Sequence, residues 1–481
     1  MKAFVKFSNS GNYYIYDTNT NNVLKVDSSI YNIVDYLPHN SSVSSSNDPH
    51  HVNSLRTIQE FKSKYGALNC FPLSKPKFKF SKSIESELRS NLNRLQLNIT
   101  NKCNLRCRYC VFNTSFKGKR SHSIESMSFK VAKDSIDYFL SNSSSKPTIS
   151  FYGGEPLIEW QMIIKVLEYI KDHYLNKNIS VALTTNLTLL TKDILEKLIE
   201  HDVYLNISLD GPKLIHDKYR VDINGNGTHA IVCNNIALIK ETNIDYYKSR
   251  ASFQISYNHN DSINTIIQYI YNSDLFSVDN SITINHLRIP DGGFEFNTAY
   301  NKINDEYIEV YWNHIYENIK NNAPINLYTK LLLELLLKGP IGIYRRLAHN
   351  IQNDTTLHPN GCCIPGLSRL FVSTTGEFYT CESFGERSRN IGNHKSGIEI
   401  GSVKGIINDY LDISREDCLN CWAMHLCTLC YLSAYDWERR EFNKSLKRKA
   451  CSERRKSIIS GLKRIMIIID LNPDYLSTYI D

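Results

Sequence analysis

The spacing of hydrophobic residues changes along the chain and divides it into regions. Between residues 92 and 290, short apolar stretches alternate with segments in which apolar residues recur every three or four positions. Such alternation predicts β-strands separated by amphipathic helices. The predicted strands are 92–100, 147–154, 179–186, 203–211, 251–258 and 281–289, and the clearest helices are 159–175 and 191–201.

Repeated strand–helix units favour a parallel sheet, so the predicted fold class is α/β. Six strands are fewer than the eight of a closed barrel, and we therefore expect a partial (β/α)6 barrel over residues 91–300. In such folds functional residues gather where the strands end. Polar or small residues follow four of the predicted strands: a cysteine-containing loop after residue 100, Gly153 to Pro156, Asn186, and Ser208 to Asp210.

The first 90 residues show a different order of elements. They predict strands at 1–7, 12–17 and 23–27 and helices at 28–37 and 52–66. The polar turn at 18–22 makes the last two strands a hairpin, and a basic linker near 74–90 follows the second helix. No residue of this β-β-β-α-α region is a candidate for catalysis.

The last third of the chain is also subdivided by its pattern. Residues 301–359 predict a polar helical bridge, and residues 360–455 are rich in cysteine with few long periodic segments. A small, loop-rich region of this kind needs metal to hold it together. Residues 456–481 are expected to form a C-terminal helix and tail.

Composition restricts the class of protein. The chain has 481 residues, of which 42% are hydrophobic and 22% charged, as in soluble globular proteins. The N-terminus lacks a secretion-signal pattern, and no apolar run approaches the roughly 20 residues that span a bilayer. We therefore expect a cytoplasmic protein without a membrane partner, in which the 13 cysteines do not form disulfides.

The cysteines are distributed unevenly. Cys103, Cys107 and Cys110 are spaced C-x3-C-x2-C on the loop after the first barrel strand. Three thiolates can bind three irons of a [4Fe–4S] cluster and leave the fourth iron open to an amine and a carboxylate. The alternative is structural zinc, which prefers four ligands in paired C-x2-C units.

This motif resembles that of the radical S-adenosylmethionine (SAM) superfamily, including the aromatic residue Tyr109 before the last cysteine. The segment Phe-Tyr-Gly-Gly-Glu-Pro-Leu at 151–157 strengthens the resemblance. It implies a cluster that passes an electron to the sulfonium of SAM, after which a 5′-deoxyadenosyl radical abstracts a hydrogen from the substrate. A reductant such as flavodoxin or ferredoxin is an implied partner.

The resemblance also implies which residues bind SAM. Glycines without a Cβ let the backbone pass close to the SAM amino group, and a carboxylate can accept from its ammonium. The implied amino-binding residues are Gly153, Gly154 and Glu155, and further candidates for the ribose or carboxylate are Asn186, Ser208 and Arg220. For Ser208 and Arg220 a strand-end cap and a surface charge are the alternatives, and Asp210 is interpreted as a turn former.

The later cysteines resemble the SPASM extension of radical SAM enzymes, which binds two auxiliary [4Fe–4S] clusters. One departure is that the central motif is C-x2-C-x5-C-x2-C, with two residues in its last interval instead of three. By resemblance the nearer cluster takes Cys363, Cys381 and Cys430, and the farther one takes Cys418, Cys421, Cys427 and Cys451. Cys362 either completes the nearer cluster or is a bystander that leaves an iron open. Structural zinc is the alternative, with His425 as a further ligand.

Charge is concentrated near the C-terminus. Residues 439–464 carry a balance of +9, whereas the whole chain carries +7. Three interpretations are a solvated helix, a surface for an acidic peptide or nucleic acid, and charge that balances a cluster near Cys451.

SPASM enzymes mostly modify peptides, and residues 1–90 resemble the winged-helix recognition module of enzymes that mature ribosomally made peptides. Such modules add a leader peptide to a sheet edge. The resemblance implies a maturase of a precursor peptide with a leader sequence, and we favour a sulfur-to-carbon thioether crosslink. Carbon–carbon crosslinking, epimerisation and anaerobic sulfatase maturation are alternatives within the superfamily. A zinc-stapled nucleic-acid-binding protein is the alternative from another class.

Overall fold

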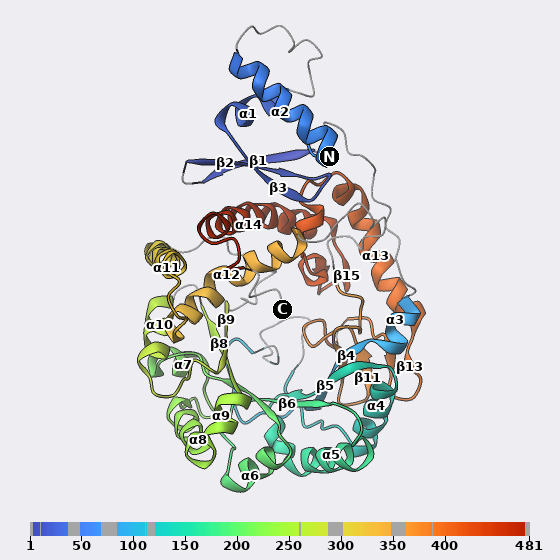
Figure 1. Cartoon of the computed structure of the whole chain (residues 1–481). Helices are drawn as coiled ribbons and strands as arrows, with labels where there is room; N and C mark the ends of the chain where they lie inside the picture. The colour runs from blue at the N-terminus through green and yellow to red at the C-terminus, as the bar shows by residue number, and fades with distance from the viewer. Residues whose placement is uncertain are drawn as a thin grey trace.

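The computed structural model describes residues 3–9, 11–36, 49–68, 84–110, 112, 121–258, 261–286, 302–347, 362–386 and 388–476. Figure 1 shows a curved sheet with helices on its outer side, and a smaller N-terminal sheet set apart from it. No helix in the described ranges is both long and apolar enough to cross a membrane. Cys70 and part of the predicted basic linker lie outside the described residues.

All six predicted barrel strands are confirmed. They are β4 (Leu92–Thr100), β5 (Ser143–Gly153), β6 (Ser180–Thr185), β7 (Tyr204–Ser208), β8 (Ala251–Tyr257) and β9 (Ser281–His286). They pair in parallel in this order, as the strand–helix pattern predicts. The helices between them are α4 (Phe129–Ser141), η3 (Pro156–Glu159), α5 (Trp160–His173), α6 (Lys192–Glu200), α7 (Lys213–Tyr219), α8 (His229–Thr242), α9 (Ile244–Arg250) and α10 (Ile263–Asn272).

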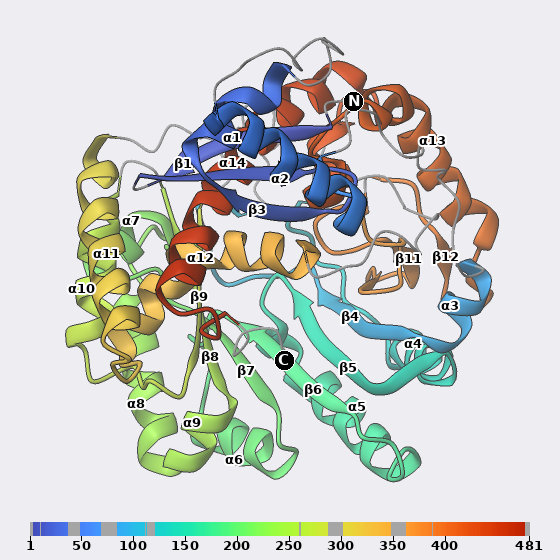
Figure 2. The ribbon, with the colours of Figure 1, turned by 45° about the horizontal axis from the view of Figure 1, so that its top comes forward.

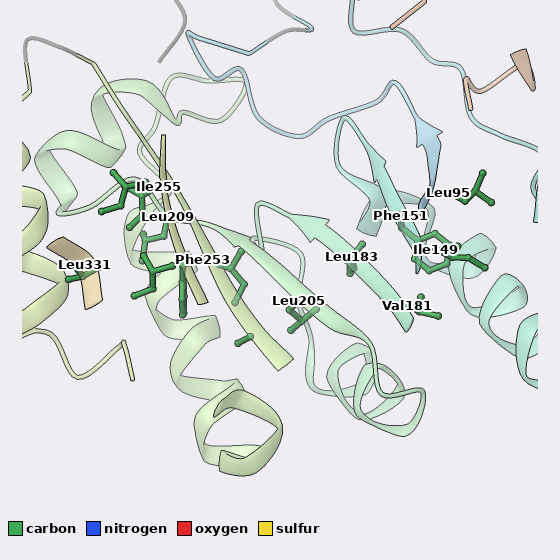
Figure 3. Packing of buried hydrophobic residues seen from close by; sticks show 14 of the residues in the cluster. Leu95, Ile149, Phe151, Val181, Leu183, Leu205, Leu209, Phe253, Ile255 and Leu331 are labelled. Carbon is green, nitrogen blue, oxygen red and sulfur yellow. The ribbon is translucent and has the colours of Figure 1, made fainter. Parts of the chain in front are cut away.

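Alternation along the strands separates an apolar face from a polar one. Buried side chains such as Leu95, Phe151, Leu183 and Phe253 lie on the face that the helices cover (Figure 3). Residues between them point to the opposite face, and these are mostly polar: Gln96, Asn98, Ser150, Thr184, Asn206 and Gln254. The barrel therefore has a dry outer layer and a polar inner face.

The cysteine-rich region extends the same sheet. Strand β10 (Leu370–Val372) pairs in parallel with β4, and β11 (Glu377–Tyr379), β12 (Gly392–Asn393) and β13 (Gly397–Ile398) follow as antiparallel neighbours. A separate hairpin is formed by β14 (Tyr435–Asp436) and β15 (Glu441–Phe442). Because β4 bonds β5 on one side and β10 on the other, both cysteine regions are attached to one sheet.

The expectation of few long elements between 360 and 455 is wrong. Helix α13 (Ile400–Leu419) buries Val403, Ile407 and Tyr410, and α14 (Lys444–Leu471) runs without a break across the predicted boundary at 455. The buried residues of α13 recur every three or four positions, so its helical pattern is present in the sequence, whereas buried Lys447 interrupts the apolar face of α14. The predicted bridge contains α11 (Lys302–Lys320) and α12 (Leu327–Leu347), and α12 packs against α14.

The N-terminal elements occur in the predicted β-β-β-α-α order. Strands β1 (Phe4–Asn9), β2 (Asn12–Asp17) and β3 (Asn22–Val26) form an antiparallel sheet, followed by α1 (Ser28–Ile33), η1 (Val34–Tyr36) and α2 (Pro49–Tyr65). A further short helix, α3 (Ile84–Ser90), leads into β4. Figure 2 shows the small sheet lying over α14.

One carboxylate fastens this sheet to the body of the protein. Asp470, near the end of α14, accepts from Asn12 Nδ2 at 2.9 Å, from Lys25 Nζ at 3.0 Å, and from the hydroxyl of buried Tyr14. These three donors come from β2 and β3. These hydrogen bonds therefore hold the N-terminal sheet against the end of α14.

Replacing Asp470 with Ala should loosen this sheet without unfolding the barrel. The change leaves the buried Tyr14 hydroxyl without its acceptor, which costs about 1–3 kcal/mol. Hydrogen exchange of the β2 amides should become faster, whereas exchange in β4–β7 should not change. Asp474→Ala, four residues farther on and exposed, is the matched control. Equal exchange rates in β2 for both variants would contradict the assignment.

Candidate functional site

The first cysteine loop leaves β4 and is held on both sides by backbone hydrogen bonds. On one side the N–H groups of Gly154 and Glu155 donate to the carbonyls of Thr100 at 2.8 Å and Lys102 at 2.9 Å. On the other side the loop pairs with the segment after α7, where Arg106 N donates to Val221 O at 2.7 Å and Arg108 N to Tyr219 O at 2.9 Å. Cys103, Cys107 and Cys110 are thus carried by a loop with a defined path.

The two glycines are required by this contact. A Cβ on Gly154 would stand 2.1 Å from the carbonyl oxygen of Lys102, and one on Gly153 would stand 2.3 Å from that of Thr100. Gly153 also has a φ of +142°, which L-residues rarely adopt. The glycines therefore allow close packing against the cysteine loop, in addition to the SAM approach predicted from the sequence.

Glu155 is buried, with 1% of its surface exposed, and its carboxylate joins three segments. It accepts from Leu157 N at 3.1 Å, from Thr185 Oγ1 at 2.8 Å and from Asn186 N at 2.7 Å. Burial raises its pKa to about 7, against the lowering effect of these donors. Its SAM contact stays a prediction, because these hydrogen bonds show a role in joining β5 to the end of β6.

Asn186 is brought to the cysteine loop as the fold geometry predicts. Its Nδ2 donates to Asn104 Oδ1 at 3.0 Å, and its Oδ1 accepts from Thr188 N at 2.9 Å. Asn104 Nδ2 in turn donates to Thr188 Oγ1 at 2.7 Å. The ends of β4 and β6 are therefore linked through side chains beside Cys103.

Asp210 is the main residue that sequence reasoning missed, since it was interpreted as a turn former. It is fully buried and pairs with Arg220 Nε at 2.7 Å. The same carboxylate accepts from the Tyr109 hydroxyl and from Ser256 N, the latter at 2.9 Å. The Arg220 guanidinium also lies 5.4 Å from the centre of the Tyr109 ring. Asp210 thus ties the C-x2-C turn to β7 and β8, and Arg220 is a buried ion-pair partner, not a surface charge.

A histidine links the backbone of the two residues of this ion pair. His216 Nδ1 accepts from Asp210 N at 3.2 Å, and its Nε2 lies 3.1 Å from Thr228 Oγ1, which donates to the Arg220 carbonyl. Burial, followed by the Arg220 charge, lowers the pKa of His216 to about 3. The imidazole is therefore neutral at physiological pH and acts as an acceptor. Ser208 lies at the end of β7, in register with Gln254.

The first three thiols lie close enough for their charges to interact. Burial raises the pKa of Cys103 to about 12, and the Cys107 and Cys110 thiolates add to the rise. The pKa of Cys107 is raised to about 11, although the Arg220 cation lowers it. Within the described ranges no three Cys, His, Asp or Glu side chains are arranged to hold a metal ion as they stand. Three soft thiols on one loop are nevertheless the donor type that iron–sulfur clusters use.

The resemblance assigns the later cysteines to two ligand sets, and this assignment stays a prediction. In one set, burial raises the pKa of Cys362, Cys363 and Cys381, and the Cys430 thiolate adds to each rise. Cys363 and Cys430 are exposed, and the Cys362 thiol donates to Leu429 O at 2.9 Å. We call Cys362, Cys363, Cys381 and Cys430 the nearer cysteine set.

The other set is more deeply buried. Cys418 and Cys427 are 4% and 8% exposed. Burial raises the pKa of both thiols, and the Cys421 and Cys451 thiolates contribute to each rise. We call Cys418, Cys421, Cys427 and Cys451 the farther cysteine set. The Cys427 thiolate also acts on Cys362, so these charges do not separate the two sets, and the ligand sets stay a prediction.

Comparison with known proteins addresses the family. Residues 97–262, which include the cysteine loop, Glu155 and Arg220, match the radical SAM superfamily. The chain carries a radical SAM domain. The curated relatives include an uncharacterised protein of Methanocaldococcus jannaschii, 38% identical over 32% of this chain and 50% of its own length. The radical SAM cyclopropyl synthase TigE of Paramaledivibacter caminithermalis is 27% identical over 48% of this chain and 52% of its own length. The chain thus spans about half the length of these two relatives.

A longer match supports the fold beyond this domain. A cysteine-type anaerobic sulfatase-maturating enzyme of Clostridium perfringens is 23% identical over 68% of this chain and 84% of its own length. The solved structure of anSMEcpe with bound AdoMet covers 81% of this chain and 98% of its own, with a TM-score of 0.58 and 19% identity. This likeness shows that the two chains share a fold.

The glycine contact can be tested directly. Gly154→Ala should displace the loop that carries Cys103, because a Cβ at 2.1 Å from the Lys102 oxygen cannot be accommodated. After anaerobic reconstitution we expect the variant to bind less iron than the parent, and the missing amount should equal the iron bound by the first cysteine group. The free energy of unfolding should fall by about 1–3 kcal/mol. Gly339→Ala is the control, since a Cβ there meets no atom within 4 Å. Iron binding equal to that of the control would refute the proposed packing role.

The buried ion pair can be tested by a double-mutant cycle. Asp210→Asn leaves the buried Arg220 cation uncompensated and should lower the free energy of unfolding by about 3–5 kcal/mol. Combining it with Arg220→Gln should cost less than the sum of the two single changes. Asp202→Asn, in the exposed pair with Arg250, should cost less than about 1 kcal/mol. Additive single changes in chemical denaturation would show that Asp210 and Arg220 do not act together.

Proposed function

We propose that the protein is a radical SAM peptide maturase that installs a sulfur-to-carbon thioether crosslink in a ribosomally made precursor peptide. The observation that carries this proposal is the shared sheet. Strand β4 leads into the first cysteine loop and pairs with β10, and β11, the antiparallel neighbour of β10, ends two residues before Cys381 of the nearer cysteine set. A rigid sheet thus holds two groups of thiols in a fixed relation, as a reaction between two parts of one peptide requires.

The first loop is proposed to bind the SAM-cleaving [4Fe–4S] cluster through Cys103, Cys107 and Cys110. This group, when bound with SAM, supplies a 5′-deoxyadenosyl radical that abstracts hydrogen. The chain's own residues keep the loop in place: the backbone contact at Gly154 on one side and the Asp210–Arg220 pair on the other. Gly153, Gly154, Glu155, Asn186, Ser208 and Arg220 stay the proposed SAM-binding residues.

The nearer cysteine set is proposed to bind an auxiliary cluster that faces the peptide. Exposure of Cys363 and Cys430 supports this, because a peptide thiol has to reach the group. The Cys362 thiol is turned toward the Leu429 carbonyl, which supports Cys363 as the ligand and Cys362 as the bystander. The farther cysteine set is proposed to bind the second auxiliary cluster, so that residues 360–455 form a SPASM extension.

Polar groups on the inner face of β4 are suited to contact the peptide. Asn98 Nδ2 donates to Glu386 at 3.1 Å, which links β4 to the region after Cys381. The buried Gln96 Oε1 and Asn98 Oδ1 have no hydrogen-bond partner among the described residues. Such acceptors are costly to bury unless a bound N–H satisfies them. We propose that peptide amide groups donate to them.

The N-terminal sheet is proposed to bind the leader sequence. Strand β3 is at one edge of the three-stranded sheet and can accept a further strand. Tyr16 of β2 packs against Trp422 at 6.2 Å between ring centres, beside Cys421 of the farther cysteine set. A leader on β3 would therefore be anchored to the same body that carries the cysteines. The anSMEcpe structure with a bound Cp18Cys peptide shows peptide binding in a protein of this fold.

The basic segment does not favour nucleic-acid binding. Several of its charges are used within the molecule: Arg448 pairs with Asp417 at 2.8 Å, Lys444 with Glu416 at 3.3 Å, and Lys456 with Glu453 at 3.0 Å. Lys447 is fully buried. Sulfatase maturation stays the second candidate, because the match to the Clostridium perfringens enzyme covers 84% of that protein.

The test is anaerobic purification followed by turnover. The chain should contain iron and sulfide in similar amounts, and addition of SAM and a strong reductant should release 5′-deoxyadenosine. Cys107→Ala should abolish this release, whereas Cys233→Ala, outside all three cysteine groups, should retain it. If a reading frame beside the gene encodes a cysteine-containing peptide, co-expression with that peptide should give a product lighter by two hydrogens per crosslink, as measured by mass spectrometry.

Three outcomes contradict the proposal. Zinc in place of iron would favour the nucleic-acid-binding alternative. Modification of a sulfatase peptide but not of the precursor peptide would favour sulfatase maturation. A precursor product whose cysteines still react with alkylating reagents would exclude a thioether and favour carbon–carbon crosslinking or epimerisation.

A further inference from the structure

Lys447 is a buried cation in an unusual position. It lies in the first turn of α14 with 0% of its surface exposed. Its Nζ lies 3.3 Å from Cys418 Sγ and 3.7 Å from Cys451 Sγ, and 5.9 Å from the centre of the Tyr410 ring. These contacts direct the ammonium group at two sulfurs of the farther cysteine set.

The neighbouring basic residues on the helix are accessible to solvent, unlike Lys447. Lys444 and Arg448 are solvent-accessible and pair with Glu416 and Asp417. Lys447 takes part in none of the ion pairs found among the described residues, and its Nζ hydrogen bonds go to the sulfurs of Cys418 and Cys451. A buried ammonium without a counter-ion is unfavourable, so this lysine needs negative charge on the sulfurs.

Two arginines add to the positive surroundings. Arg454 and Arg346 both lie close enough to Cys427 for their charges to interact. Arg454 Nε is buried without a hydrogen-bond partner among the described residues. At the nearer cysteine set the Glu382 carboxylate raises the pKa of Cys381, the Arg369 cation lowers that of Cys363, and Arg346 also interacts with Cys362. Positive charge therefore lies near both sets, and Lys447 contacts two sulfurs of the farther set.

We propose that Lys447 tunes the redox state of the cluster held by the farther cysteine set, raising its reduction potential through N–H···S contacts and its fixed positive charge. The proposal rests on the proposed function, in which Cys418, Cys421, Cys427 and Cys451 are the ligands. Reduction adds one negative charge to a cluster that is already anionic. A cation held against two ligand sulfurs stabilises that added charge more than it stabilises the oxidised form.

The test compares Lys447→Met and Lys447→Gln with Lys449→Met in the full-length, reconstituted chain. Lys449 is an exposed lysine two residues away, and its replacement changes the net charge equally. A second series carries Cys103, Cys107 and Cys110 as alanine, which removes the signal of the first cysteine group. Iron and sulfide content is measured for each variant, and the reduced clusters are followed by electron paramagnetic resonance during a redox titration.

The expected result is a fall of at least about tenfold in the ratio of reduced to oxidised farther cluster for Lys447→Met, at the potential where the parent is half reduced. For a one-electron couple this corresponds to about 59 mV. Lys447→Gln should shift less, because its amide retains a donor, and Lys449→Met should match the parent.

An unchanged midpoint in Lys447→Met with full iron content would overturn the inference while leaving the proposed function intact. Loss of the farther cluster from both Lys447 variants, with helical content retained, would also overturn it and assign Lys447 to cluster assembly instead. A parent protein that binds no iron at the farther cysteine set would overturn both the inference and the assignment of its ligands.

Discussion

The contact between the end of β5 and the backbone of Thr100–Lys102 is the constraint on which the site depends. Two N–H groups of the Gly-Gly-Glu turn donate to two carbonyls at the start of the cysteine loop. This pairing is possible because Gly153 and Gly154 have no Cβ, which would stand only 2.3 Å and 2.1 Å from the carbonyl oxygens of Thr100 and Lys102. The loop therefore continues the sheet instead of leaving it as a free segment, and its cysteines acquire fixed positions.

The second support of the loop is electrostatic. Asp210, at the end of β7, accepts from Tyr109 in the loop and pairs with Arg220 behind it. In a buried environment such a pair persists only when its hydrogen bonds are complete, and Ser256 N supplies a further donor to the Asp210 carboxylate. The neutral His216 accepts from the Asp210 backbone N–H. The ends of β4, β5, β7 and β8 thus meet at one place, where SAM is proposed to bind.

The extension of the sheet through β10 connects this place to the later cysteines, and α14 connects those cysteines to the N-terminal sheet. Near its start, α14 directs Lys447 at Cys418 and Cys451, and near its end Asp470 binds β2 and β3. One helix therefore joins the proposed leader-binding sheet to the more buried cysteine set. Part of the positive charge concentrated at residues 439–464 lies inside the protein, because Lys447 of this segment is buried against the sulfurs of Cys418 and Cys451.

The sequence by itself determined the order of the six parallel strands, the N-terminal element order, and the concentration of cysteines at 103–110 and 362–451. The alternation of strands and the periodicity of helices are local properties of the sequence. The spacing of residues in a motif likewise does not depend on tertiary packing. Tertiary structure alone decided what Asp210, Arg220 and Lys447 contact. From the sequence, a carboxylate after a strand can either form a turn or be buried with several hydrogen-bond donors. A lysine in a basic segment can either be exposed to solvent or be buried against sulfur atoms. Only the neighbours brought in from distant parts of the chain decide between these states, because the cost of burying a charge depends on what surrounds it.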